Sequence, residues 1–138
     1  MGDEVFWDTS GFFALMNPDD DAHERARKWA ASTAGKRRGL TTEWVIGETC
    51  TLLTARNKPH LVGRFLDRLN ETAALTVINP DDTLLAAAKL YVRRHAERGY
   101  SFVDCISFCL MKERRLRESF TTDGHFRQAG FFAILVAP

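Results

Sequence analysis

Short apolar segments alternate with helical segments along the whole of this 138-residue chain. The apolar segments occupy residues 5–7, 39–41, 74–78, 119–121 and 131–136. Repeated β–α units of this kind predict a parallel sheet whose two faces are covered by helices. We therefore predict an α/β fold with a central parallel sheet of about five short strands, and one domain that spans residues 1–138.

Capping residues, prolines and glycines mark the helices between these strands. The helices are expected at about residues 9–16, 23–33, 44–56, 59–70, 80–98 and 102–114, with a short turn of helix between the last two strands. Asn79 and Pro80 predict a cap followed by a proline at the first helical position. Gly99 predicts the end of that helix, and Ser101 predicts the cap of the next one.

Composition and charge exclude several classes of protein. The chain is 45% hydrophobic, which is enough for a single core without disulfides or metals. Its net charge of +1 provides no global basic field, so a nucleic acid would have to meet a local patch or a bound metal. Its apolar runs are too short to span a bilayer, and Asp3, Glu4 and Asp8 argue against a signal peptide. We expect a cytoplasmic protein that does not enter a membrane.

The three cysteines, Cys50, Cys105 and Cys109, are interpreted as small buried hydrophobic residues. They cannot all pair, and histidines at zinc-ligand spacing are lacking beside them. This usage suits a reducing compartment.

Four acidic residues are the strongest candidates for chemistry: Asp8, Glu48, Asp104 and Asp123. Asp8 and Asp123 follow predicted strands, and ligands of open α/β sheets bind beyond the carboxyl ends of the strands. Asp104 opens an otherwise apolar helix. Burying a carboxylate is costly unless it is compensated, and a hard divalent cation is the common compensator for several. Such a site indicates phosphodiester chemistry.

Each acid also has an ordinary structural explanation. Asp8 could be an N-cap, Asp104 part of a capping box, Asp123 a turn residue and Glu48 a surface acid. Taken together, these explanations require four unrelated coincidences at one edge of the sheet.

Glu43 and His125 are further polar candidates beside these four. On a helical wheel Glu48 lies next to the buried stripe of its helix, whereas Glu43 lies on the opposite side and is expected in solvent or in the cap. His125 could be a base or a phosphate contact, but its place in an Asp-Gly turn favours a surface histidine.

Four segments that contain these acids, residues 5–14, 42–53, 101–111 and 120–130, resemble the PIN-domain nucleases. Within that family the chain is most similar to the VapC toxins of VapBC type II toxin–antitoxin pairs. The resemblance implies a ribonuclease, specifically an endoribonuclease that hydrolyses RNA with Mg²⁺ or Mn²⁺. It also implies three partners: an RNA substrate, a cognate antitoxin protein, and a second copy of the chain in a homodimer.

The family's catalytic and metal-binding acids correspond to Asp8, Glu48, Asp104 and Asp123, and its hydroxyl before the last acid corresponds to Thr121. We expect Asp8 and Asp104 to be the tightest metal ligands. Glu48 would orient a metal-bound water or act as a base, and Asp123 would complete the site or bind through water. A hydroxyl after the first acid is also expected, from Thr9 or Ser10.

Other functions were weighed against this reading. A phosphatase of the haloacid dehalogenase type needs a second aspartate two residues after Asp8, where this chain has Ser10. A receiver domain needs an acidic pair after the first strand and a lysine after a late strand, and both are lacking. A PIN nuclease that processes RNA without being a toxin, and a non-catalytic α/β binding adaptor, stay open as alternatives.

Overall fold

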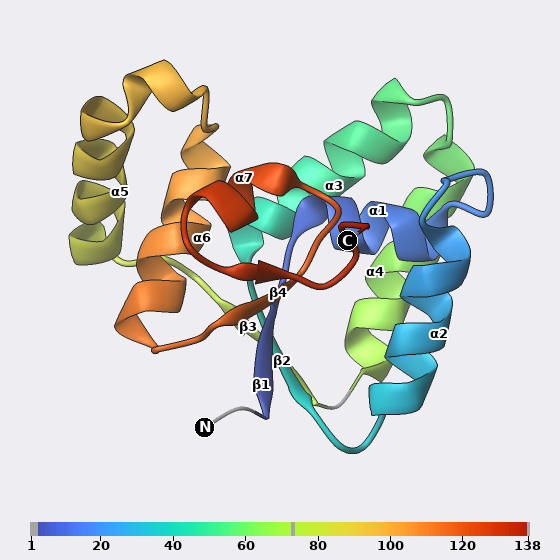
Figure 1. Ribbon diagram of the computed structural model, residues 1–138. Helices are drawn as coiled ribbons and strands as arrows, with labels where there is room; N and C mark the ends of the chain where they lie inside the picture. Colours follow the sequence, from blue (N-terminus) through green and yellow to red (C-terminus); the bar gives the residue numbers. More distant parts are fainter. Residues whose placement is uncertain (1–2, 73, 138) are drawn as a thin grey trace.

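β1 lies at the centre of a five-stranded parallel sheet, with the order β3-β2-β1-β4-β5 (Figure 1). In the computed structural model, residues 3–72 and 74–137 are described. The strands are β1 (Glu4–Trp7), β2 (Arg38–Thr42), β3 (Leu75–Ile78), β4 (Glu118–Phe120) and β5 (Phe132–Ala133). This confirms the predicted fold class.

The strand order reverses between β1 and β4. From β1 the chain proceeds outward through β2 to β3, and it then returns to the other side of β1 to form β4 and β5. A reversal of this kind leaves a crevice at the carboxyl ends of the two strands that flank it. Trp7 pairs with Phe120, and the Asp8 amide donates to the Phe120 carbonyl at 3.2 Å. The residues that follow β1 and β4 are therefore neighbours.

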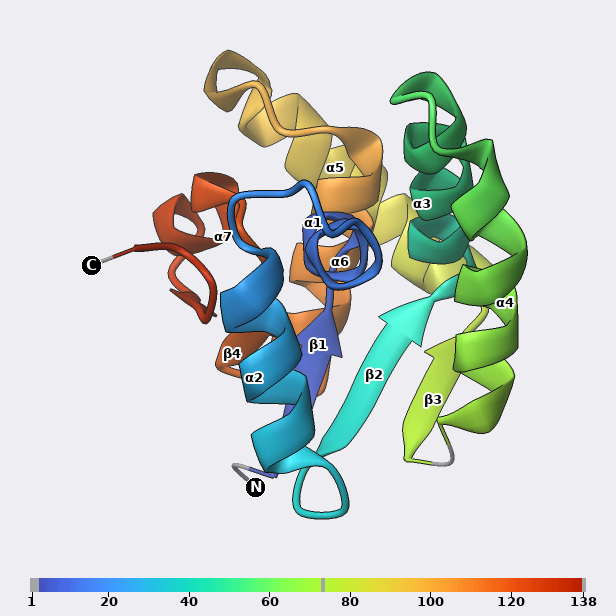
Figure 2. The same ribbon diagram turned by 90° about the vertical axis from the view of Figure 1, so that its right-hand side faces the viewer.

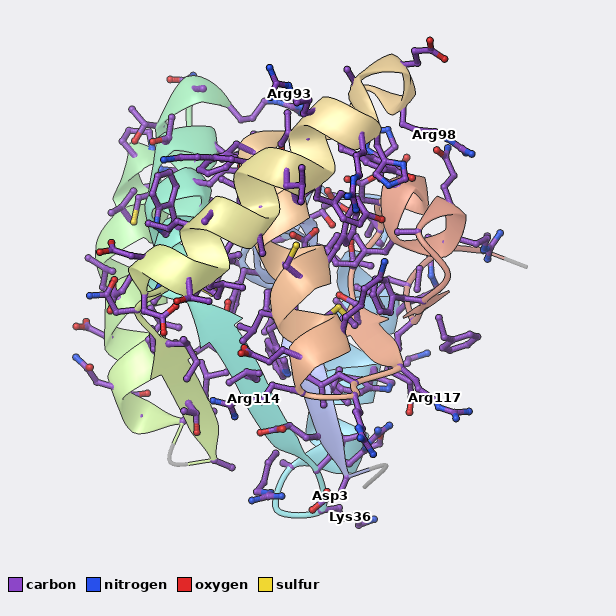
Figure 3. The ribbon with its side chains drawn as sticks, turned by 90° about the vertical axis from the view of Figure 1, so that its left-hand side faces the viewer. Asp3, Lys36, Arg93, Arg98, Arg114 and Arg117 are labelled. Atoms are coloured by element: carbon purple, nitrogen blue, oxygen red, sulfur yellow. The ribbon has the colours of Figure 1, made fainter. Side chains whose placement is uncertain are left out.

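Helices cover both faces of the sheet. They are α1 (Thr9–Met16), α2 (His23–Thr33), α3 (Glu43–Ala55), α4 (Val62–Glu71), α5 (Asp82–Arg94), α6 (Phe102–Glu113) and α7 (Gly124–Gln128), with 3-10 turns η1 (Pro59–Leu61) and η2 (Ala96–Arg98). Figure 2 shows α2 and α4 on one face. Figure 3, viewed from the other side, shows α5 and α6 on the opposite face.

The buried hydrophobic residues form two clusters that meet at β1. Phe6 points into the larger cluster, which includes Phe108 and Met111 of α6, and Val5 points into the smaller cluster beside α2. The two side chains point oppositely because successive residues of a strand alternate between faces. Cys105 is buried in the larger cluster, while Cys50 and Cys109 are half-buried thiols, and all three are free.

Several predicted boundaries differ from the structure. Asp81, not Asn79, caps α5: its carboxylate accepts from the Leu84 amide at 2.8 Å. The helix predicted to run to residue 98 ends at Arg94 and continues as the short turn η2, after which Gly99 adopts a left-handed φ of 74°. The helix predicted from Pro59 begins as the 3-10 turn η1.

The last strand is also shorter than predicted, since β5 covers only Phe132–Ala133. β5 pairs with β4 at two positions, and the turn that follows stays beside β4, since the Ile134 and Leu135 amides donate to the Ser119 and Thr121 carbonyls. Among the described residues, the helices are too short or too polar to cross a membrane.

Candidate functional site

Asp8 lies at the carboxyl end of β1 and is almost fully buried, with 3% of its surface exposed. It caps α1, because its side chain accepts a hydrogen bond from the Ser10 amide. The same oxygen, Oδ2, accepts from the Thr121 hydroxyl at 2.8 Å and from the Ser10 hydroxyl at 3.1 Å. The capping role foreseen for Asp8 is therefore real, but it leaves the carboxylate inside a network that extends to the next strand.

Two hydroxyl groups connect the ends of β1 and β4. Ser10 Oγ and Thr121 Oγ1 are 2.8 Å apart. The backbone amides of Thr122 and Asp123 donate to them, at 2.9 Å to Ser10 Oγ and 3.0 Å to Thr121 Oγ1. Each hydroxyl has a single proton to donate, so when Thr121 donates to Asp8, Ser10 donates either to Asp8 or to Thr121. The structure thus places Thr121, and Ser10 rather than Thr9, beside the first acid.

Glu48 is half-buried on α3 and faces α1. Its Oε1 accepts from the Thr9 hydroxyl at 2.7 Å. Thr9 and Ser10 therefore serve different acids, although the sequence could not distinguish them. Glu43 is exposed on the same helix, as the wheel predicts.

Asp104 occupies the first turn of α6 inside a complete capping box. Ser101 Oγ accepts from the Asp104 amide at 3.0 Å, and Asp104 Oδ2 accepts from the Ser101 amide at 3.2 Å. His125 Nδ1 lies 3.3 Å from the same carboxylate oxygen. Asp104 is buried, yet 9% of its side chain stays exposed, so the carboxylate has one side toward solvent.

Asp123 follows β4 and caps α7, accepting from the His125 amide at 2.9 Å. Its Oδ1 is 3.6 Å from His125 Nδ1. Asp104, Asp123 and His125 each offer a ligand atom, and these atoms lie within 4.8 Å of one another. This is the one group of that kind among the described residues, and Asp8 and Glu48 lie outside it.

The electrostatics show that these acids share one region. Burial raises the pKa of Asp8 to about 7, and the nearby Asp104 carboxylate acts in the same direction. Burial and then Asp123 raise the pKa of Asp104. Burial is also the main cause of a raised pKa at Glu48, to which Asp104 and Asp123 add. Carboxylates that raise one another's pKa are uncompensated negative charges.

A divalent cation fits this donor set. Within residues 3–72 and 74–137, no lysine or arginine lies within ion-pair distance of the four acids, and His125 is their one basic neighbour. Hard cations such as Mg²⁺ and Mn²⁺ prefer carboxylate oxygens. By distance, Asp104, Asp123 and His125 could share one ion, while Asp8 and Glu48 stand outside that group.

His125 is the residue that the sequence misjudged. It is half-buried, with 33% of its side chain exposed, and it contacts Asp104 rather than lying free in a turn. Its ring also packs edge-on against Tyr100 at 5.2 Å. The contact joins residues that are 21 positions apart, so neither spacing nor turn chemistry could reveal it.

A hollow lies at the opposite, amino-terminal edge of the sheet. It has a volume of about 580 Å³, and Figure 3 shows Asp3, Arg114 and Arg117 at that end of the molecule. Two of the acids that line it are paired with arginines: Arg38 pairs with Asp3 at 3.3 Å, and Glu118 pairs with Arg37 at 2.8 Å. Four arginines line the hollow, so it is a less favourable place for a cation than the carboxyl edge.

Comparisons with known proteins agree with this geometry. The PIN domain family matches residues 5–132. The "23S rRNA-specific endonuclease VapC20" of Mycobacterium tuberculosis is 34% identical over 132 residues, which cover 94% of this chain and 97% of that protein. A "VapC ribonuclease" of Archaeoglobus fulgidus is 29% identical, over 80% of this chain and 71% of that protein.

A solved structure is also similar to this one. The crystal structure of M. tuberculosis VapC20, described as a "Sarcin-Ricin loop cleaving toxin", superposes with a TM-score of 0.83 and 32% identity. The match covers 97% of this chain and 99% of that one.

Proposed function

Because the chain belongs to the PIN-domain family, we propose that it is a metal-dependent endoribonuclease and the toxin of a type II toxin–antitoxin pair. The observation that carries the proposal is the set of four acids at the reversal of strand order, where burial and neighbouring carboxylates raise the pKa of Asp8, Glu48 and Asp104 and no lysine or arginine of the described residues lies close enough to offset them. The names of the relatives, an endonuclease and a ribonuclease, support RNA as the substrate.

In this proposal Asp8, Asp104 and Asp123 hold Mg²⁺ or Mn²⁺, and Glu48 lies at the edge of the site. The ion, when bound, lowers the pKa of a water molecule and offsets the charge that develops on the phosphate. The protein supplies the carboxylates at fixed positions. Asp8 is fixed by Thr121 and Ser10, and Asp104 by the Ser101 amide.

The remaining polar side chains have positioning roles in the proposal. Glu48, held by Thr9 at 2.7 Å, orients the attacking water or accepts its proton, because a raised pKa brings a carboxylate nearer to the range of a general base. His125 holds the same Asp104 oxygen that accepts from the Ser101 amide. Thr121 fixes Asp8 and, through its oxygen, the backbone of Asp123.

The toxin role implies that the acidic site is blocked by a partner until it is needed. We propose that an antitoxin supplies an arginine to the acids in place of the metal, since a guanidinium matches carboxylates with paired hydrogen bonds. A homodimer of this chain is proposed on the same basis, the similarity to the VapC proteins.

Incubation of the purified protein with total RNA in Mg²⁺, in Mn²⁺ and in EDTA, followed by mapping of the ends, tests the proposal. Ribosomal RNA is the first substrate to inspect, given the name of the M. tuberculosis relative. We expect cuts with either ion, none in EDTA, and at least a hundredfold slower cleavage by Asp8→Asn and Asp104→Asn. Glu43→Gln, an exposed acid on α3, is the matched control. Cleavage that persists in EDTA would contradict the proposal.

A further inference from the structure

An exposed tryptophan lies on the same side of α3 as Glu48. Trp44 is 41% exposed, and it precedes Glu48 by four residues, which is one helical turn. Its ring contacts Phe102 of α6 edge to face, with centroids 5.4 Å apart and an interplanar angle of 81°. Phe102 comes two residues before Asp104. The aromatic pair therefore joins the beginnings of the two helices that carry Glu48 and Asp104, beside the carboxyl end of β1 (Figure 1).

This tryptophan lies outside the buried core. Val45 and Leu53 are the fully buried apolar side chains of α3, whereas Trp44 is exposed and packs on Phe102, a half-buried ring at the margin of the larger core cluster. Among the described residues, Phe102 is the one ring that contacts it. A large apolar ring thus stays in solvent beside the acids.

Tyr100, the other ring close to the acids, is in a different position. It contacts Phe108 at 5.1 Å and His125 at 5.2 Å, both edge to face. Its ring is half-buried between Phe108 and His125 and supports the histidine ring. Trp44, in contrast, keeps a ring face available to a ligand.

We propose that Trp44, supported by Phe102, binds one unstacked nucleobase of the RNA whose backbone enters the acidic site. This inference rests on the proposed ribonuclease function. A base has two flat faces that stack on an aromatic ring, while its phosphate must reach the carboxylates. One helical turn is about 5.4 Å, so the distance between Trp44 and Glu48 is similar to the distance between a nucleobase and the sugar-phosphate backbone of the same nucleotide.

This nucleobase-binding site at Trp44, called the base site below, also determines whether single-stranded or duplex RNA binds better. In a duplex, neighbouring bases already cover both faces of a base, whereas bases in single strands and loops are free to stack on protein side chains. The platform therefore favours single-stranded or looped RNA over a continuous duplex.

RNA binding by Asp8→Asn protein in Mg²⁺ tests the inference, because this background leaves the strand uncut. The probes are a short fluorescent single-stranded RNA of mixed sequence and a blunt duplex that contains the same strand. We expect Trp44→Ala to weaken single-strand binding about tenfold and to leave duplex binding unchanged. Trp44→Phe should keep most of the affinity. Phe132→Ala is the matched control. Phe132 is an aromatic residue that is 61% exposed, and it lies on the edge strand β5, whereas α3 follows β2 on the other side of β1.

Three results would overturn the base site: equal affinity of Trp44→Ala and its parent for the single strand, an equal loss for strand and duplex, or no single-strand binding by the parent. A changed mass of Trp44→Ala in light scattering would assign the ring to a subunit contact and overturn it too. If Trp44→Ala melts at a lower temperature, Trp44→Leu replaces it, because leucine keeps the apolar contact with Phe102 and lacks the aromatic face.

Wild-type cleavage in Mn²⁺ is measured in parallel. If the wild-type protein cuts RNA and Trp44→Ala binds the strand normally, the base site fails while the nuclease function stands. If the wild-type protein does not cut RNA in either ion, the proposed function itself fails.

Discussion

The charge state of Asp8 has a direct consequence for stability. Its pKa in the folded protein is about 7, against 3.8 for the ordinary group, chiefly because the carboxyl is buried. A group whose folded pKa is raised contributes stability that is fully present below its unfolded pKa and is lost as pH rises through its folded pKa. The metal-free protein should therefore lose stability between about pH 4 and pH 7.

Asp8→Asn tests this first prediction. Asparagine is uncharged and still caps a helix. At pH 8 in EDTA the variant should therefore melt at a higher temperature than the wild type, and its free energy of unfolding should be larger by on the order of 2 kcal/mol. At pH 4 the two melting temperatures should approach each other. Glu43→Gln should show no such pH-dependent difference. A variant that is less stable than the wild type at pH 8 would show that the Asp8 charge is compensated.

His125 provides a second prediction at the residue scale. Its hydrogen bond to Asp104 lowers the pKa of that carboxyl and fixes its position. His125→Ala should therefore weaken Mn²⁺ binding and slow cleavage about ten- to a hundredfold, as is usual for a partner that orients a metal ligand. The measurement is a titration of melting temperature with Mn²⁺, and His60→Ala, on the exposed turn η1, is the control. If His125→Ala binds Mn²⁺ as tightly as the wild type, His125 has no role in metal binding.

Asp8, Asp104 and Asp123 could be named from the sequence because each stands next to a strand or helix boundary that local signals mark, whereas Glu48, inside α3, was located by its place beside the buried stripe of the helix. Thr121 was also foreseen, at the end of β4. The hydrogen bonds that join these residues were not foreseen: Ser10 and Thr121 meet only because β1 and β4 are adjacent, and His125 reaches Asp104 only because α7 packs against α6. These contacts depend on topology.

The junction between α1 and β4 shows how tightly one element fixes another. Gly11 lies in α1, and a Cβ atom placed on it would stand 2.0 Å from the Phe120 carbonyl oxygen. The backbone of α1 is therefore in contact with the strand that precedes Thr121. Any larger residue would push α1, and with it the position of Asp8, away from β4.

Gly11→Ala should accordingly destabilise the protein by about 3 kcal/mol or more, because the clash involves backbone that cannot rotate away. Gly47→Ala is the matched control: Gly47 is also inside a helix, but a Cβ atom there meets nothing within 4 Å. It should stabilise the protein by about 0.5 to 1 kcal/mol. Urea denaturation of both variants measures the difference. Equal effects of the two substitutions would contradict the close contact.

Element boundaries were predictable where the signal is local. α1 and α2 begin and end where the sequence places them, because a capping acid and an Asn-Pro pair define α1. The start of α5 was misplaced because Asn79 and Asp81 both make good caps, and only the structure shows which side chain accepts the Leu84 amide. The length of β5 depends on its pairing with β4, which no local pattern records.

At the scale of the whole molecule, charge is divided between the two edges of the sheet. The four candidate acids gather at the carboxyl edge, and Arg38, Arg114, Arg115 and Arg117 line the hollow at the amino edge together with Asp3, Glu4 and Glu118. A net charge of +1 thus conceals a strongly acidic site. Binding of a cation at that site should stabilise the fold, since it binds the folded state alone.

Mn²⁺ should raise the melting temperature of the wild type by several degrees, which corresponds to about 2.7 kcal/mol when the ion is at a hundred times its dissociation constant. Asp104→Asn should lose most of this response. It should also melt at a higher temperature than the wild type in EDTA, because it removes a charge that burial and Asp123 disfavour. Differential scanning fluorimetry in EDTA and in Mn²⁺ measures both effects. A wild-type melting temperature that is indifferent to millimolar Mn²⁺ would favour a non-catalytic adaptor.

The last prediction separates a toxin from a nuclease with a constitutive role in RNA processing. A toxin is harmful whenever its site is open, so expression of this chain without an antitoxin should arrest growth. Asp8→Asn should abolish the arrest while the purified variant keeps its cooperative melting transition, because the substitution preserves the cap of α1 and the hydrogen bonds from Ser10 and Thr121. Glu43→Gln should arrest growth as the wild type does. If wild-type expression is harmless while the purified protein cuts RNA in Mn²⁺, the nuclease assignment stands and the toxin assignment fails.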